Sequence, residues 1–182
     1  HGQAKINLWC LDKINTLSIY GYNQLMLSPK FWQLVKNQGT EKVLIFQPDG
    51  FPIRTGIEIF LDYDYIGAPW KFAPDIYTVD SIPKIISCVG NGGFSFRSVS
   101  KMIHALEEFP PRDWLLKNYP EDVYYASVFP HLGFNIATKE EAMKFSHESV
   151  YNQLDTFGSH CGWRYNNEIK NFIEIRLKLE IK

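Results

Sequence analysis

The sequence predicts a single α/β domain with a mixed, mostly parallel sheet and helices on both of its faces. A continuous apolar run of strand length, Glu41 to Gln47, is typical of a strand buried on both sides near the centre of such a sheet. A second strand, around Phe94 to Arg97, follows a glycine-rich turn and leads into an amphipathic helix from Val99 to Phe109. Strands that alternate with helices in this way favour the α/β class.

In the N-terminal half, the predicted elements follow from a helix-start signal and from short apolar runs. Ser28 before Pro29 is a typical helix start and Gly39 a typical stop, so we predict a helix over about residues 29–37. Trp32 and Val35 should then face the core. Weaker patterns predict a strand at 5–11, a helical turn at 57–61, a strand at 63–68 and a surface loop at 71–84 long enough to serve as a lid.

The C-terminal half is predicted to contain helices separated by short strands. Pro110 and Pro111 end the first helix, and Pro120 followed by two carboxylates begins the next, as the helix dipole favours. Thr138 precedes a short helix at 139–145. The remaining predictions are a strand at 134–137 and a final helix or exposed strand at 166–182.

Composition indicates a folded, aromatic-rich protein. Hydrophobic residues make up 45% of the chain and aromatic residues 15%, which argues against disorder. A formal net charge of −1, without basic runs, argues against a nucleic-acid partner. Three distant cysteines form no Cys-x-x-Cys pair, so a reducing, cytoplasmic compartment is favoured over a disulfide framework or zinc site. No apolar run approaches the roughly 20 residues of a membrane span.

The glycine-rich segment from Cys88 to Ser98 is the strongest local candidate for a site. Gly90, Gly92 and Gly93 are more glycine than a hairpin turn requires, and bare backbone lets a ligand approach closely. The two phenylalanines that follow alternate with Ser and Arg, which predicts aromatic side chains on one face and polar ones on the other. An ordinary glycine-rich turn is the alternative interpretation.

Other candidate side chains lie on loops or at a helix start. Asp49 follows the predicted central strand on a loop rich in Pro and Gly, where open α/β sheets bind ligands. A turn Asp that caps its own backbone explains it equally well. His160 lies between glycines and aromatic residues. Glu121 and Asp122 also fit a charged first helical turn.

In this order the motifs resemble a family of uncharacterised glycosyltransferase-like domains, over about residues 22–163. The segments that carry the resemblance are Gln47-Pro48-Asp49, Asp64 to Trp70, Gly90 to Arg97, Pro120 to Val123 and Gly158-Ser159-His160. In looser form the order resembles metal-dependent glycosyltransferases of the GT-A fold. Those enzymes have an Asp-x-Asp metal motif after a strand, a Gly-Gly strand beside the sugar, a Glu-Asp pair and a late metal-binding His. The resemblance implies a GT-A-like, Rossmann-like sheet and transfer of a hexose from a nucleoside diphosphate sugar to a hydroxyl of a glycan or other acceptor.

The resemblance also implies a metal site and a general base. Asp49 and His160 would bind Mn²⁺ or Mg²⁺, together with phosphate oxygens and water. Asp122 would accept the proton of the acceptor hydroxyl, because a carboxylate at a helix start is well placed for that role. Glu121 would face hydroxyls of the donor or acceptor.

Six further positions are implied in substrate binding. Trp70 would stack on the acceptor sugar, and bare backbone at Gly92 and Gly93 would let a sugar ring approach. Arg97 would reach the diphosphate, with a structural ion pair as the alternative. The other two positions are Gln47 and Asn91.

Two departures from the family pattern favour an alternative, a catalytically inactive carbohydrate-binding or scaffold domain. Gln47 stands where the first carboxylate of Asp-x-Asp belongs, and only about 40 residues precede the strand at Glu41. We therefore expect part of the base-binding half to be abbreviated or absent, with a core at 22–163 and an extension at 164–182. A hydrolase is disfavoured because no Gly-x-Ser-x-Gly elbow is present.

Overall fold

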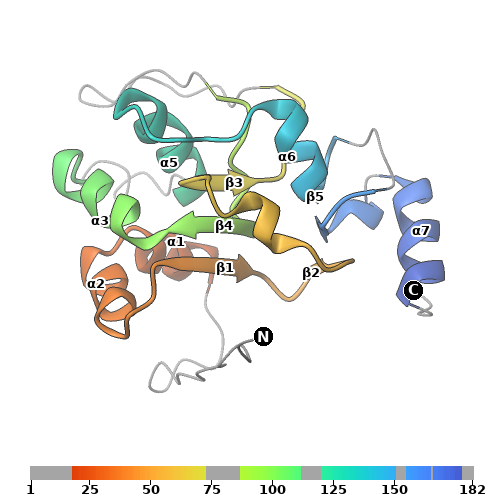
Figure 1. The fold of residues 1–182 in the computed structure, drawn as a ribbon, viewed down its shortest axis with the longest axis horizontal. Helices are drawn as coiled ribbons and strands as arrows, with labels where there is room; N and C mark the ends of the chain where they lie inside the picture. The colour runs from red at the N-terminus through yellow and green to blue at the C-terminus, as the bar shows by residue number, and fades with distance from the viewer. Residues whose placement is uncertain (1–17, 73–86, 112–119, 151–154, 165, 178–182) are drawn as a thin grey trace.

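The computed structural model describes residues 18–72, 87–111, 120–150, 155–164 and 166–177. In this part of the chain helices combine with two small sheets of three strands each, which confirms the predicted mixed α/β class (Figure 1). The strand predicted at 5–11 and most of the loop predicted at 71–84 lie outside the described residues.

The larger sheet is centred on the strand that follows the glycine-rich turn. β4 (Phe94–Ser98) lies between β1 (Lys42–Phe46) and β3 (Tyr65–Gly67), and both pairings are antiparallel. All five residues of β4 are buried, whereas four of the five in β1 are only half-buried. β4 therefore holds the central position that the sequence predicted for the strand at Glu41 to Gln47.

The predictions of a mostly parallel sheet and of a central β1 are wrong for the described strands. β1 pairs there with β4 alone, so it is an edge strand. Its Val43 and Ile45 pack on one hydrophobic cluster and its Leu44 on the other. A short apolar run fits any strand covered on both faces, and the pattern cannot separate parallel from antiparallel or centre from edge.

A second, unpredicted sheet contains the shortest strands. β6 (Gly158–His160) lies between β2 (Gly50–Pro52) and β5 (Ser146–His147), antiparallel to the former and parallel to the latter. In this register Gly50 is opposite His160. Runs of two or three residues are too short to show a hydrophobic period. The sheet nevertheless brings the turn after β1 against β6.

Helices cover both faces of the larger sheet, as predicted. One face packs against the cluster formed by α2 (Pro29–Asn37), α3 (Val99–Glu108) and α5 (Glu121–His131). The opposite face packs against η1 (Ile57–Phe60) and α6 (Lys139–Phe145). The polar side chains of β4, such as Arg97, point to the first of these faces. They contact α5 there and are not exposed to solvent.

Capping residues explain where two of these helices begin. The Ser28 side chain accepts a hydrogen bond from the Phe31 N–H, and Trp32 and Val35 of α2 are buried, as predicted. Thr138 and Glu141 form a reciprocal capping box at the start of α6.

Three other segments and the helical turn η2 (Gly162–Arg164) remain. α1 (Ile19–Met26) was not predicted, and α7 (Asn167–Leu177) makes the described part of the segment predicted at 166–182 helical rather than extended. Between residues 134 and 137 only an isolated bridge, Tyr65 to Ile136, replaces the predicted strand. Among the described helices, none has the length and apolar character needed to cross a membrane.

Candidate functional site

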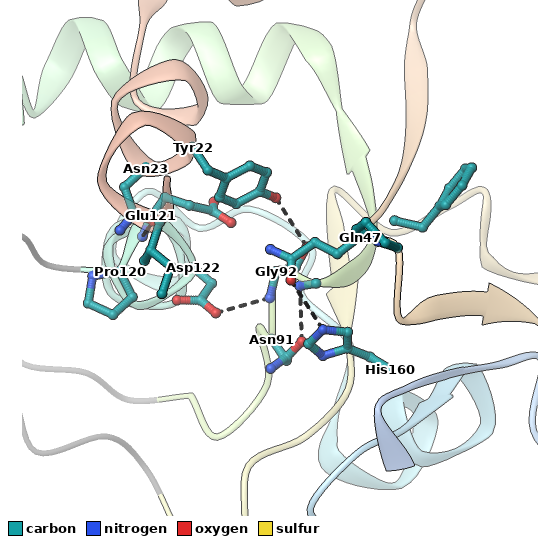
Figure 2. A pocket seen from close by; sticks show the side chains of 13 residues that line it. Tyr22, Asn23, Gln47, Asn91, Gly92, Pro120, Glu121, Asp122 and His160 are labelled. Carbon is teal, nitrogen blue, oxygen red and sulfur yellow. Dashed lines mark hydrogen bonds between the residues drawn. The ribbon is translucent and has the colours of Figure 1, made fainter. Parts of the chain in front are cut away.

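A cleft of about 660 Å³ lies over the glycine-rich turn. Its walls come from α1, the end of β1, the turn before β4, the start of α5 and the end of β6 (Figure 2). These segments are far apart in the sequence, and the fold brings them together around one opening. Seven of the ten predicted site residues line it: Gln47, Asn91, Gly92, Gly93, Glu121, Asp122 and His160.

Gly92 and Gly93 lie between the Glu121–Asp122 pair and His160 in this cleft. A Cβ on Gly92 would overlap the Glu121 carboxylate and lie 3.1 Å from the Cβ of Asp122. A Cβ on Gly93 would overlap the His160 imidazole. The missing side chains therefore let the protein's own groups pack onto the turn from both sides, a role different from the predicted approach of a sugar ring.

Asp122 is a half-buried carboxylate held by backbone donors. Its Oδ2 accepts from the Gly92 N–H at 3.0 Å (Figure 2), and its Oδ1 accepts from the Val123 N–H at 2.8 Å. Burial and the neighbouring Glu121 raise the pKa of Asp122 to about 7, although these N–H groups and Arg97 oppose the shift. The side chain is thus close to half-ionised at neutral pH, where a general base works best.

Glu121 has a different environment although it is the adjacent residue. Both of its carboxylate oxygens accept from Arg97, at 2.6 and 2.8 Å, and the two residues are 1% and 0% exposed. The guanidinium also lies 5.0 Å from the ring centre of Tyr65 and 5.8 Å from that of Tyr125. Glu121 lines the cleft with each oxygen bound to Arg97, and its remaining lone pairs could still accept from substrate hydroxyls, as predicted.

Arg97 and Trp70 do not line the cleft wall formed by the described residues. For Arg97 the structure supports the alternative, a structural ion pair, over contact with a diphosphate. Trp70 packs against the hydrophobic cluster that α2, α3 and α5 cover, and its backbone N–H donates to the Cys88 carbonyl. Neither residue is placed for its predicted contact with substrate.

The cleft also has walls that sequence reasoning missed. Tyr22 donates from its hydroxyl to the Gly92 carbonyl at 3.4 Å, and the Asn23 side chain accepts from the Glu121 N–H at 3.2 Å. Phe46 is 61% exposed at the mouth of the cleft. An aromatic residue at the end of an apolar strand was the available signal for Phe46, whereas α1 had no pattern that placed its polar side chains.

His160 is enclosed by oxygen atoms on both ring nitrogens. Its Nε2 lies 3.4 Å from Asp49 Oδ1 and 3.3 Å from Gln47 Oε1, and its Nδ1 lies 3.2 Å from Glu148 Oε1. The predicted convergence of Asp49 and His160 is confirmed. Burial by itself would lower the pKa of His160, but hydrogen bonds with Cys161 and Glu148 outweigh it and raise the pKa to about 10.

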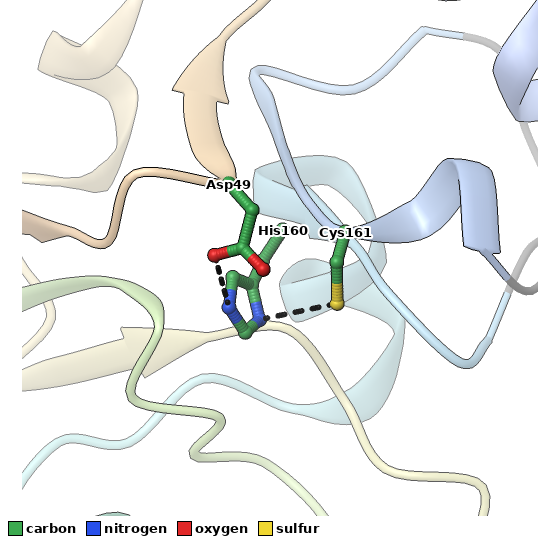
Figure 3. Close-up of side chains that lie close together, drawn as sticks. All are labelled: Asp49, His160 and Cys161. Atoms are coloured by element: carbon green, nitrogen blue, oxygen red, sulfur yellow. Dashed lines mark hydrogen bonds and ion pairs between the residues drawn. The ribbon is translucent and has the colours of Figure 1, made fainter. Parts of the chain in front are cut away.

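Asp49, His160 and Cys161 have potential metal-ligand atoms within 4.8 Å of one another (Figure 3). Asp49 and Cys161 approach different nitrogens of the His160 ring. Asp49 faces Nε2, whereas the Cys161 sulfur lies 4.0 Å from Nδ1. One cation can bind only one of the two nitrogens. The oxygens of Asp49 and Gln47 on the Nε2 side therefore form a better-matched donor set than the thiol does.

The turn after β6 has an unusual backbone. Cys161 has a φ of 41°, in the left-handed region that residues other than glycine seldom adopt. Its N–H donates to the Asp49 carbonyl at 2.9 Å, and Arg164 lies 3.5 Å from Asp49 Oδ2. These contacts fix Asp49 beside His160 although Asp49 is on a turn.

Comparison with known proteins gives a family for the chain. A family model described as "Protein of unknown function (DUF5672)" matches residues 5–160, a span that includes all ten predicted site residues. No curated protein matches the chain. Because the match covers most of the sequence, this chain belongs to the DUF5672 family.

Proposed function

We propose that this protein is a glycosyltransferase that moves a hexose from a nucleoside diphosphate sugar to a hydroxyl of a glycan or other acceptor. One observation carries the proposal. A single cleft is lined by Asp122, a carboxylate with a pKa near 7, on one side of Gly92–Gly93 and by His160 on the other; Asp49, outside the lining, lies 3.4 Å from the Nε2 of His160. Sugar transfer needs these two functions, a base for the acceptor and a centre for the leaving diphosphate.

Asp122 is the proposed base. As the acceptor oxygen forms its bond to the anomeric carbon, the bond from that carbon to the diphosphate breaks, and the acceptor proton passes to an Asp122 oxygen. Hydrogen bonds from Gly92 and Val123 fix the carboxylate, and burial keeps it basic enough to accept a proton. Glu121 supports it from outside the reaction by keeping Arg97 neutralised beneath the turn.

Asp49, Gln47 and the Nε2 of His160 are the proposed ligands of a divalent cation, whose binding would displace the proton that the raised pKa of His160 keeps on Nε2 at neutral pH. When bound, such a cation supplies positive charge for the diphosphate leaving group. A carboxylate, an amide oxygen and an imidazole suit Mn²⁺ better than Mg²⁺, which prefers oxygen ligands alone. Gln47 thus offers an uncharged oxygen at the position where the Asp-x-Asp motif of GT-A glycosyltransferases has a carboxylate.

The cleft dimensions are compatible with a sugar substrate. Its volume of about 660 Å³ lies in the range of small-molecule sites. The lining also contains the apolar residues Phe46 and Pro48, which suit the C–H face of a sugar ring. A GT-A-like arrangement is part of this proposal; its support is that four of the five resembling segments, all but Asp64 to Trp70, contribute to one cleft, while the antiparallel pairing of β1, β3 and β4 counts against it.

A carbohydrate-binding domain without turnover is the second candidate. Two observations favour it. Arg97 neutralises Glu121. Because Gln47 has no charge, Asp49 is the one carboxylate that the described residues place on the Nε2 side of His160. The deciding experiment measures nucleoside diphosphate release from a panel of sugar nucleotides, with and without Mn²⁺. Mn²⁺-dependent release that Asp122→Asn abolishes supports the enzyme. Saturable donor or glycan binding without release supports the binding domain.

A further inference from the structure

Glu148, directly after β5, is a buried carboxylate that contacts the candidate site from behind. It is 8% exposed and does not line the cleft. Its Oε1 accepts from the Asn91 side-chain amide at 2.7 Å and lies 3.2 Å from His160 Nδ1. A buried carboxylate is costly unless hydrogen bonds compensate for the lost water, and these two contacts supply that compensation.

The contact with Nδ1 determines how His160 presents its other nitrogen. A proton on Nδ1 donates to Glu148, which leaves Nε2 directed at Gln47 and Asp49 beside the cleft. The backbone of Gly93 closes off one side of the ring, since even a Cβ there would overlap it. The imidazole is therefore constrained by Glu148 behind it, by the turn beside it and by two oxygens in front.

The contact with Asn91 extends the same constraint to the glycine-rich turn. Asn91 donates to Glu148 through Nδ2, and its Oδ1 accepts from the Gly93 N–H at 3.0 Å. Asn91 is 7% exposed, so this chain of hydrogen bonds is shielded from water. Through it one carboxylate links the position of His160 to the backbone that separates His160 from Asp122.

We propose that Glu148 is a positioning residue that holds His160 with Nε2 toward the cleft and couples this orientation to the glycine-rich turn through Asn91. The metal-binding consequence rests on the proposed function above, whereas the orientation of the imidazole does not. Partners behind a ligating His typically change metal affinity 10- to 100-fold when removed.

The test compares full-length Glu148→Ala and Glu148→Gln with the matched control Glu107→Ala, which removes an exposed carboxylate from α3. In the metal-free protein, a Glu148-bound Hδ1 of His160 should give a downfield proton resonance protected from exchange with water. Glu148→Ala should lose this resonance. Glu148→Gln should keep it, shifted upfield, because an amide oxygen still accepts but without charge. Glu107→Ala should leave it unchanged.

Titration with Mn²⁺ alone supplies the second measurement. We expect the affinity to fall 10- to 100-fold in Glu148→Ala, less than that in Glu148→Gln, and not at all in the control. An Hδ1 resonance that is absent from the wild type, or that persists unchanged in folded Glu148→Ala, overturns the inference. If Glu148→Ala does not fold, an unshifted resonance in Glu148→Gln overturns it equally. A wild type that binds no Mn²⁺ refutes the metal part of the proposed function and leaves the Hδ1 test intact.

Discussion

The two sides of the Gly92–Gly93 pair use carboxylates in different ways. On the Gly92 side, Glu121 and Asp122 are neighbours in the sequence, yet one is neutralised by a buried guanidinium and the other has a pKa near 7. On the Gly93 side, Asp49 and Glu148 come from distant segments and meet at opposite nitrogens of one imidazole. The first side suits transfer of a proton, and the second suits a cation.

The difference shows that the partner sets the chemistry of a carboxylate more than its position in the chain does. Glu121 faces Arg97, which has no exposed surface, and both of its carboxylate oxygens accept from the guanidinium. Among the described residues, Asp122 accepts hydrogen bonds from backbone donors alone, and burial and the negative Glu121 raise its pKa against their effect. Two adjacent acidic residues thereby acquire separate tasks, one structural and one proposed as catalytic.

The largest effect is expected when the buried ion pair between Arg97 and Glu121 is removed. Glu121→Ala leaves the Arg97 guanidinium buried without its counter-charge, and we expect a loss of about 3–5 kcal/mol in the free energy of unfolding. Urea unfolding measures it, with Glu107→Ala on α3 as the exposed control. A loss below about 1 kcal/mol would show that Arg97 finds another partner and that the ion pair does not hold the turn.

The second largest effect is expected when the proposed catalytic base, Asp122, is removed. Asp122→Asn keeps the shape of the side chain and removes the base, so turnover should fall by about 10²-fold or more while donor affinity changes little. Nucleoside diphosphate release and donor titration measure the two quantities separately. A folded Asp122→Asn variant with wild-type turnover would end the assignment of Asp122 as the base.

A third effect tests the environment of Asp122 through pH. Its pKa is about 7 in the folded protein against 3.8 in the unfolded chain, so the folded state holds the proton more tightly. The stabilisation from this group is complete below about pH 4 and is lost as the pH rises through about 7. The difference between these two pKa values limits the pH-dependent change in the free energy of unfolding to about 4 kcal/mol. Partial exposure of the carboxylate reduces this change to roughly 2 kcal/mol.

The measurement is the difference in unfolding free energy between wild type and Asp122→Asn at pH 5 and pH 8. Subtracting the variant removes the contribution of the other titrating groups, including His160. The variant should gain stability relative to the wild type as the pH rises. A difference that does not change with pH would mean that Asp122 ionises in the folded protein as it does in water.

Local signals in the sequence predicted much of the fold. The helix at 29–37 was predicted from Ser28 and Pro29, and the helix at 139–145 from Thr138, because a cap acts within one turn. Strand order depends on contacts between distant residues, which a single apolar run does not encode. For that reason β1 was predicted at the centre of the sheet and the three strands around His160 were missed.

The site was predicted by residue type better than by residue role. Glycine-flanked polar residues such as Asp49 and His160 were identified because loops with open backbone bring side chains together. Glu148 was missed, since no glycine or motif distinguishes it from a surface Glu. For Arg97 the sequence left diphosphate contact and a structural ion pair open, because the cover that α5 forms over β4 appears only in three dimensions.

The smallest expected effect sharpens the comparison on the Gly93 side. Asp49→Ala removes the one carboxylate that the described residues place beside His160 Nε2 and should weaken Mn²⁺ binding about 10-fold, a loss near 1.4 kcal/mol. Asp155→Ala is the matched control. Each Asp is paired with an Arg, Asp49 with Arg164 at 3.5 Å and Asp155 with Arg54 at 3.4 Å, but only Asp49 contacts His160.

The pairing with Arg164 makes the control necessary. Either substitution breaks an ion pair on a partly exposed surface, which costs little stability by itself. Equal, small changes in melting temperature with weaker Mn²⁺ binding in Asp49→Ala alone would locate the cation at His160 Nε2. If both variants bind Mn²⁺ as tightly as the wild type, Asp49 is not a ligand and serves only to fix the turn between β1 and β2.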